Sequence, residues 1–126
     1  MPPMPTDAEL DILAVLWRRG ASTVREVHDD LRKDSGYTTT LKQMQMMMDR
    51  ELVVRNERFR SHVYEAAVPK EDTRRQLAGD LLTRAFDGSA RNLMLGALSA
   101  KPASEEELDE IRVLLRDFEK KRRSRK

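Results

Sequence analysis

Cysteine is absent from the 126 residues of this chain, and aromatic residues are scarce, with three Phe, two Tyr and one Trp. The lack of thiols excludes disulfide bridges and thiolate metal sites, and it fits a reducing compartment. No apolar run approaches the roughly 20 residues of a membrane-spanning helix, so we expect no membrane insertion. The start, MPPMPTDAEL, has neither the basic nor the apolar region of a signal peptide. These absences together predict a cytoplasmic protein.

Charge is plentiful but unevenly placed. The chain holds 24 basic and 22 acidic residues, and six of the basic ones lie within the last seven positions, 120–126. Without those six, 18 basic residues are set against 22 acidic ones. The body of the protein is therefore not a general polycation. If it binds DNA, it must do so through a local basic surface.

Helix-start signals mark the first half of the chain. Capping boxes at Thr6–Glu9 and Thr23–Glu26 predict two helices that begin there. A third helix is expected over about 38–50, from Thr38 or Thr39 to Arg50. Residues 52–55 and 61–67 are rich in valine and tyrosine around a charged turn, which predicts a β-hairpin.

Three further amphipathic helices are predicted between residues 69 and 118. The first opens at Pro69, the second spans Ala90–Ser99, and the third is capped by Ser104. Their apolar surface exceeds what three short helices can bury alone, so we expect a dimer interface. The predicted dimerisation residues are Leu77, Leu81, Leu82, Phe86, Leu93, Leu98, Leu108, Ile111 and Leu115. The alternative is a monomer in which these helices pack back on the first half.

The predicted fold class is mainly α with a small β-hairpin. Three helices followed by a hairpin have the element order of a winged helix-turn-helix, so residues 6–68 are expected to form a DNA-binding domain. Residues 69–118 are expected to form a three-helix dimerisation lobe. Residues 119–126 are predicted to be a basic, disordered tail.

The predicted third helix has two different faces. At 100° per residue, Thr40, Met44, Met47 and Met48 fall together and suit a core. On the opposite side, lysine can donate to guanine, glutamine can pair with adenine, and threonine methyl groups suit the thymine methyl. The predicted DNA-binding residues of this face are Thr38, Thr39, Lys42, Gln45 and Met46. Any amphipathic helix has a polar face, so the pattern alone leaves a solvated surface as the alternative.

The hairpin that follows strengthens the DNA-binding hypothesis. Arg55, Arg58, Arg60 and His62 lie within eight residues, opposed there only by Glu57. Three guanidinium groups at a hairpin tip can straddle phosphates or enter a minor groove. The four basic residues are therefore predicted to contact DNA, with a solvated hairpin tip as the alternative.

Nothing in the sequence points to catalysis. His28 and His62 are the only histidines and are not spaced as a ligand pair, and no nucleophile elbow or phosphate-cradling glycine loop is present. Methionines at 44, 46, 47 and 48 invite a Cu(I) site, but consecutive helical positions diverge by 100° and cannot converge on one ion. We expect no enzymatic activity, no metal site and no cofactor.

These features resemble the penicillinase-repressor family, also called the BlaI/MecI/CopY family of transcriptional regulators. The most specific stretches are TDAELDILAVLW (6–17), GYTTTLKQMQ (36–45) and LVVR…RSHVYEA (52–66), within a resemblance that runs from Thr6 to about Phe118. It implies a homodimeric winged-helix repressor whose third helix reads each half of a palindromic operator. The implied partners are double-stranded operator DNA, a second copy of the chain, and a sensor protease or another inducing protein.

The chain departs from the family pattern in several places. In characterised relatives, repression is relieved by cleavage in the C-terminal lobe, caused by a membrane-bound metalloprotease sensor, or by metal binding to C-terminal cysteines. Here cysteine is absent, and Gly96-Ala97 stands where the Asn-Phe cleavage pair is expected. Glu51 replaces a glycine that usually follows the third helix, so we expect a different turn into the hairpin. Met46 replaces a frequent arginine, so the operator sequence does not transfer.

A function from another class is also consistent with the sequence. A winged helix can serve as a protein-interaction adaptor without sequence-specific DNA binding. The acidic body and the three-helix lobe suit a protein partner. The repressor is the leading hypothesis because the third helix, the arginine-rich hairpin and the family resemblance all agree.

Overall fold

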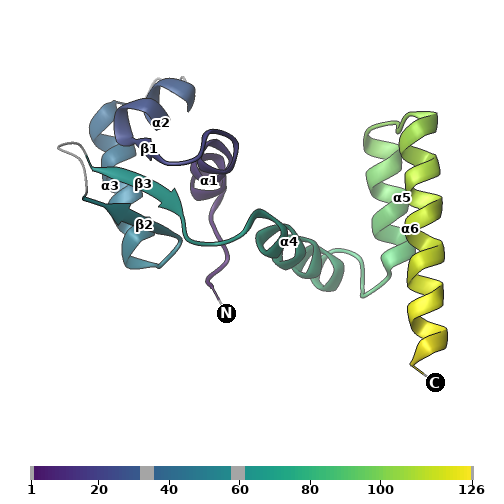
Figure 1. Cartoon of the computed structure of the whole chain (residues 1–126). Coiled ribbons are helices and arrows are strands. Elements are labelled where there is room, and N and C mark those ends of the chain that lie inside the picture. Colours follow the sequence, from purple (N-terminus) through teal and green to yellow (C-terminus); the bar gives the residue numbers. More distant parts are fainter. Residues whose placement is uncertain (1, 32–35, 58–61, 126) are drawn as a thin grey trace. The chain divides into compact units, whose positions relative to one another are not determined.

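The computed structural model describes residues 2–31, 36–57 and 62–125 (Figure 1). Its helices and strands divide into two compact units, residues 1–79 and 80–126, and each is described by itself. The fold is mainly helical with one small antiparallel sheet, as the sequence predicted.

Three helices and a three-stranded sheet form the body of the first unit. The helices are α1 (Asp7–Arg19), α2 (Val24–Leu31) and α3 (Tyr37–Asp49). The strands are β1 (Ser22–Thr23), β2 (Val53–Asn56) and β3 (Val63–Ala66), hydrogen-bonded in the order β1-β3-β2. The predicted hairpin is β2–β3, and the winged-helix arrangement is confirmed. Strand β1 was not predicted, because two residues are too few to show a period-2 pattern.

Side-chain caps start α1 and α2 where the sequence predicted them. At α1 the Glu9 amide donates to the Thr6 hydroxyl (3.2 Å), and the Thr6 amide donates to the Glu9 carboxylate (2.9 Å). Thr23 and Glu26 make the same pair of bonds at α2, and the bond from the Thr23 amide is the main reason that the pKa of Glu26 lies below its usual value. Helix α3 starts after Gly36 without a side-chain cap.

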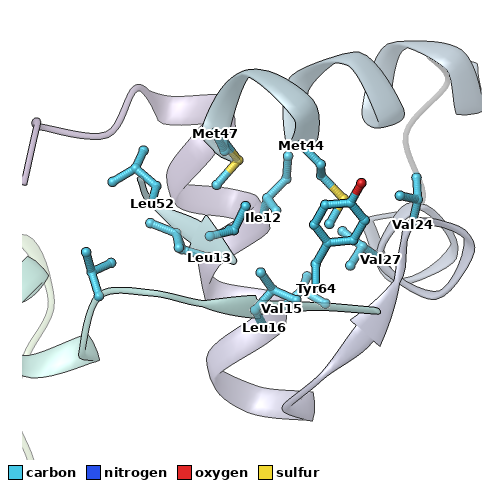
Figure 2. Close-up of a cluster of buried hydrophobic side chains, with 12 residues drawn as sticks. Ile12, Leu13, Val15, Leu16, Val24, Val27, Met44, Met47, Leu52 and Tyr64 are labelled. Atoms are coloured by element: carbon cyan, nitrogen blue, oxygen red, sulfur yellow. The ribbon is translucent and has the colours of Figure 1, made fainter. Parts of the chain in front are cut away.

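One hydrophobic core joins the helices to the sheet. Ile12 and Leu13 of α1, Met44 and Met47 of α3, and Tyr64 of β3 are at most 1% exposed. In Figure 2 these side chains gather between the two helices and the strand. Burying each of them stabilises the fold by roughly 1.5–3 kcal/mol, so the core determines how α3 is rotated about its axis.

An ion pair also ties α1 to the C-terminal end of α3. The Nε atom of Arg50 lies 3.0 Å from the carboxylate of Glu9, which is buried. The same guanidinium donates to the backbone oxygen of Met4 at 2.9 Å. Removing Arg50 would leave the buried Glu9 carboxylate without its partner, which is destabilising.

The turn from α3 into β2 has a residue in the left-handed region. Glu51 has φ +64°, and the amides of Glu51 and Leu52 donate to the carbonyl oxygens of Met48 (3.1 Å) and Met47 (2.9 Å). These two bonds define a Schellman motif, in which glycine is the usual left-handed residue. The expectation that Glu51 would bring a different turn is therefore wrong: glutamate here adopts the turn that glycine favours.

Helix α4 (Lys70–Arg84) follows the sheet and begins within the first unit. The indole Nε1 of Trp17 donates to the backbone oxygen of Val68 at 3.0 Å, and Thr73 in the first turn of α4 is buried. The division between the two units falls inside α4, between residues 79 and 80. The sequence placed the boundary before the helix, between residues 68 and 69.

The second unit contains the end of α4, α5 (Ala90–Ala100) and α6 (Glu105–Ser124). No residue of α5 or α6 is buried. Helix α6 continues past position 119, at which the sequence predicted a disordered tail to begin. Lysine and arginine are good helix formers, and Lys121, Arg122 and Arg123 lie in the last turn, where positive charge complements the helix dipole.

We predict that Glu51→Gly stabilises the protein. A side chain in the left-handed region costs roughly 1–2 kcal/mol, and the greater flexibility of glycine in the unfolded chain offsets part of that gain. The free energy of unfolding, measured by urea denaturation, should therefore rise by about 0.5–1 kcal/mol. Glu51→Ala is the control, because it removes the carboxylate but keeps the Cβ atom. An equal gain for Glu51→Ala would contradict a backbone cause.

Candidate nucleic-acid interface

The face of α3 that the sequence predicted to contact DNA is exposed. All five predicted residues project away from the core: Thr38, Thr39, Lys42, Gln45 and Met46. Thr40, Met44 and Met47 are buried on the opposite face, and Leu41 and Met48 pack partly against the core. The structure thus confirms the division of α3 into two faces and leaves four polar side chains and one thioether available to a ligand.

A chain of contacts between α2 and α3 holds the first turn of α3 in place. Nδ1 of His28 lies 2.9 Å from the hydroxyl oxygen of Thr40, which is buried. The ring of His28 meets the ring of Tyr37 edge to face, with centroids 6.2 Å apart. On the face of the Tyr37 ring, the guanidinium carbon of Arg25 lies 4.4 Å from the centroid. Tyr37, which also contacts His28, therefore supports an exposed guanidinium.

Arg55, which the sequence predicted to contact DNA, already has partners within the hairpin. In the β2–β3 pair it lies opposite Tyr64, and its guanidinium donates to the Glu57 carboxylate at 2.6 Å. The Tyr64 hydroxyl and then the Glu57 carboxylate raise the pKa of Arg55 above its usual value. This guanidinium is half-buried and already has two partners, so it supports the base of the hairpin as well as adding positive charge there.

The remaining predicted hairpin residues divide into two groups. Arg58 and Arg60 lie outside the described residues. His62 is described and exposed, directly before β3.

A cavity of about 340 Å³ opens beside the first turn of α3. It is lined by Val24, Leu41 and Tyr64, and by four residues with polar or charged groups: Thr23, Arg25, Tyr37 and His62. It therefore brings together the start of α2, the start of α3 and the residue before β3. Arg25 and Tyr37 were missed by the sequence analysis. The only local sequence feature that could have pointed to Arg25 is its position, two residues after Thr23, which caps α2.

The predicted dimerisation residues do not form a buried core within one chain. Leu81 and Leu115 are about half exposed, at 50% and 47%. The other seven are partly exposed: Leu77, Leu82, Phe86, Leu93, Leu98, Leu108 and Ile111. Leu114 and Phe118 of α6 are exposed as well, at 52% and 59%. Leu77 belongs to the first unit and the others to the second.

Neither a metal centre nor a membrane anchor is found in the described parts of the chain. Across residues 2–31, 36–57 and 62–125, His, Asp and Glu form no group of three that could hold a metal ion. Within the same residues, no helix combines the length and the apolar character needed to cross a bilayer. Met44 and Met47 fill the core, whereas Met46 projects to solvent from the opposite face, so the methionines of α3 do not converge.

Comparison with known proteins assigns the family. The sequence model that defines the penicillinase repressor family matches residues 5–117, which include most of both units. The chain belongs to the penicillinase repressor family. This family consists of transcriptional regulators and not of enzymes, in agreement with the absence of catalytic motifs from the sequence.

Individual members of the family are similar to the chain over most of their length. A penicillinase repressor of Bacillus licheniformis is 23% identical over 123 residues, which is 96% of each chain. A penicillinase repressor of Staphylococcus aureus is 20% identical over 90% of this chain and 92% of its own. The transcriptional regulator BlaI of Mycobacterium tuberculosis is 29% identical over 90% of this chain and 83% of its own.

We predict that Thr40→Val destabilises the protein. Valine keeps the shape of threonine but cannot bond to His28, so the free energy of unfolding should fall by about 1 kcal/mol in urea denaturation. Thr39→Val is a matched control, because it makes the same change at an exposed neighbouring position and should shift stability by less than about 0.5 kcal/mol. Equal effects of the two substitutions would show that the His28–Thr40 bond contributes nothing.

Proposed function

We propose that this member of the family is a homodimeric repressor that recognises a two-fold symmetric DNA operator. The observation that carries the proposal is the exposed face of α3, which is rigidly mounted on a core through its opposite face. A recognition helix needs both properties, because hydrogen bonds to base edges require side chains that are accessible and accurately placed. Repressors of this family act on DNA in the bacterial cytoplasm, where we place this chain.

The polar residues of α3 match what the major groove offers. Lys42 can donate to O6 and N7 of guanine, and Gln45 can form a bidentate pair with adenine. The methyl groups of Thr38 and Thr39 suit contact with a thymine methyl, and their hydroxyls suit a phosphate. We assign direct base contacts to Lys42 and Gln45, and to Met46 an apolar contact in place of the arginine frequent among relatives.

The hairpin supplies positive charge next to this helix. We assign Arg58, Arg60 and His62 to contacts with the DNA backbone, which fix the orientation of a protein on the duplex but do not specify sequence. Arg55 adds to the local positive potential, although its own donors already face Tyr64 and Glu57.

The exposed apolar residues of the second unit are the reason to propose a dimer. Leu81 of α4 and Leu114, Leu115 and Phe118 of α6 are each close to half exposed or more, and no residue of α5 or α6 is buried. Leaving so many large apolar side chains in water is unfavourable, and a second copy of the chain can cover them. The family resemblance agrees, because it implies C-terminal helices that interlock two subunits. We assign the nine predicted dimerisation residues to this interface.

Selection of binding sites from random duplex DNA, repeated at two salt concentrations, tests the proposal. A dimer should enrich two symmetric half-sites with their centres about one helical turn apart. Weak binding without sequence preference, which vanishes at the higher salt, would contradict the proposal and favour a protein-interaction adaptor.

We predict different effects for residues of the helix and of the hairpin. Lys42→Ala and Gln45→Ala should each reduce discrimination between the selected site and a scrambled one by about 1–3 kcal/mol. Arg58→Ala should weaken binding to both duplexes alike. It should also reduce the magnitude of the negative slope of log K against log salt by about one unit. Binding can be measured by fluorescence anisotropy, with Lys70→Ala in α4 as a control. If all three variants affect both duplexes equally, the division between base and backbone contacts is wrong.

We predict that charge within the apolar surface of α6 prevents dimerisation. In the double variant Leu114→Asp and Phe118→Asp, dimer formation would bury unpaired carboxylates, which is costly. Sedimentation equilibrium should show a monomer for this variant and a dimer for the wild type. The control pair Leu114→Ile and Phe118→Leu keeps the surface apolar and should remain dimeric. A monomeric wild type would refute the proposed interface.

A further inference from the structure

We propose that Arg25, stacked on Tyr37, forms a binding site for one backbone phosphate of the DNA, together with His62 and Thr23. The inference rests on the proposed function and extends it, because neither α2 nor the first residue of α3 belongs to the DNA contacts assigned so far. The site is the cavity beside the first turn of α3.

The charge of the cavity favours an anion. Arg25 supplies a full positive charge at its rim, and no carboxylate is among the described residues that line it. Glu26, the nearest acidic neighbour of Arg25 in sequence, is held elsewhere: its carboxylate bonds to the Thr23 amide at 2.9 Å and to Arg19 at 2.8 Å. Arg55 is paired with the Glu57 carboxylate at 2.6 Å, so Arg25 is the main source of positive charge at this cavity among the described residues.

The donors suit a phosphoester in particular. A guanidinium group presents several N–H donors in one plane, which match the oxygens of a phosphate. The ring nitrogens of His62 and the hydroxyls of Thr23 and Tyr37 belong to the same cavity and can donate to the remaining oxygens. The apolar side chain of Leu41 in the lining suits the adjoining deoxyribose, and the volume of about 340 Å³ accommodates a sugar–phosphate unit.

The position of the cavity fits a duplex held by α3. Tyr37 is the first residue of α3 and Leu41 lies one turn later, so the cavity adjoins the turn that carries Thr38, Thr39 and Lys42. In helix-turn-helix proteins the first helix of the motif crosses the DNA backbone while the second lies in the major groove. Arg25 lies near the start of the helix that precedes α3, which is where a backbone contact is expected.

The first test is the salt dependence of binding to a random duplex. Arg25→Ala should lower affinity and reduce the magnitude of the slope of log K against log salt by about 0.9, the contribution of one phosphate. Arg25→Lys should keep the slope but bind more weakly than the wild type, because an ammonium lacks the planar fork. Arg75→Ala is the control: Arg75 is a highly exposed arginine of α4 and should behave as the wild type. Circular dichroism should show every variant folded.

The second test identifies the phosphate. Single phosphates of the selected operator are replaced in turn by uncharged methylphosphonates, and binding of the wild type and of Arg25→Ala is compared. We expect one position at which the replacement weakens binding of the wild type several-fold but leaves binding of Arg25→Ala unchanged. The reason is that two changes that remove the same contact do not have additive effects on binding. Tyr37→Leu removes the ring beneath the guanidinium. In this variant, methylphosphonate replacement at the same position should weaken binding less than it does in the wild type.

Three outcomes would overturn the site. The first is an unchanged salt slope for Arg25→Ala, and the second is additive loss at every phosphate tested. The third is a change in the preferred bases, because a phosphate contact carries no sequence information. These results are distinct from failure of the proposed function, in which the wild type itself selects no symmetric motif. If the wild type binds no duplex at all, both proposals fail.

Discussion

The burial of one face of α3 is the constraint on which the rest of the first unit depends. Met44 and Met47 pack against α1 and Tyr64, and a rotation of the helix by one residue, or 100°, would move them out of the core. The same rotation would carry Lys42 and Gln45 away from their exposed positions. The core therefore decides which side chains α3 presents, and the hydrogen bond between His28 and Thr40 secures this orientation from the side of α2.

Much of the fold could be predicted from short-range patterns. The Thr6–Glu9 and Thr23–Glu26 pairs start α1 and α2 because a capping box depends on residues three apart. What depends on distant residues was missed. Strand β1 exists only because β3 pairs with it, and the unit boundary falls inside α4 because the first turn of that helix packs on the first unit. The extent of α6 was underestimated because basic residues were interpreted as disorder, although they also suit the end of a helix.

The candidate site divides in the same way. The exposed face of α3 follows from helical periodicity alone, so all five of its predicted residues were found to be exposed. The stack of Arg25 on Tyr37 could not be predicted, because it joins residues twelve positions apart on different helices. Arg55 was predicted to contact DNA, but the strand register places it opposite Tyr64, and no short-range sequence pattern predicts that pairing. Periodicity thus predicts which residues are exposed, whereas the partners of those residues come from the tertiary structure.

An arginine side chain in water samples many rotamers, and fixing it in a complex costs up to about 2 kcal/mol of conformational entropy. The contact of the Arg25 guanidinium with the Tyr37 ring, which also meets His28, restricts this sampling within the folded chain. Part of the ordering of that guanidinium therefore accompanies folding and is already complete when an anion arrives. A lysine at position 25 could carry the same charge, but its side chain would lose more conformational entropy when an anion binds.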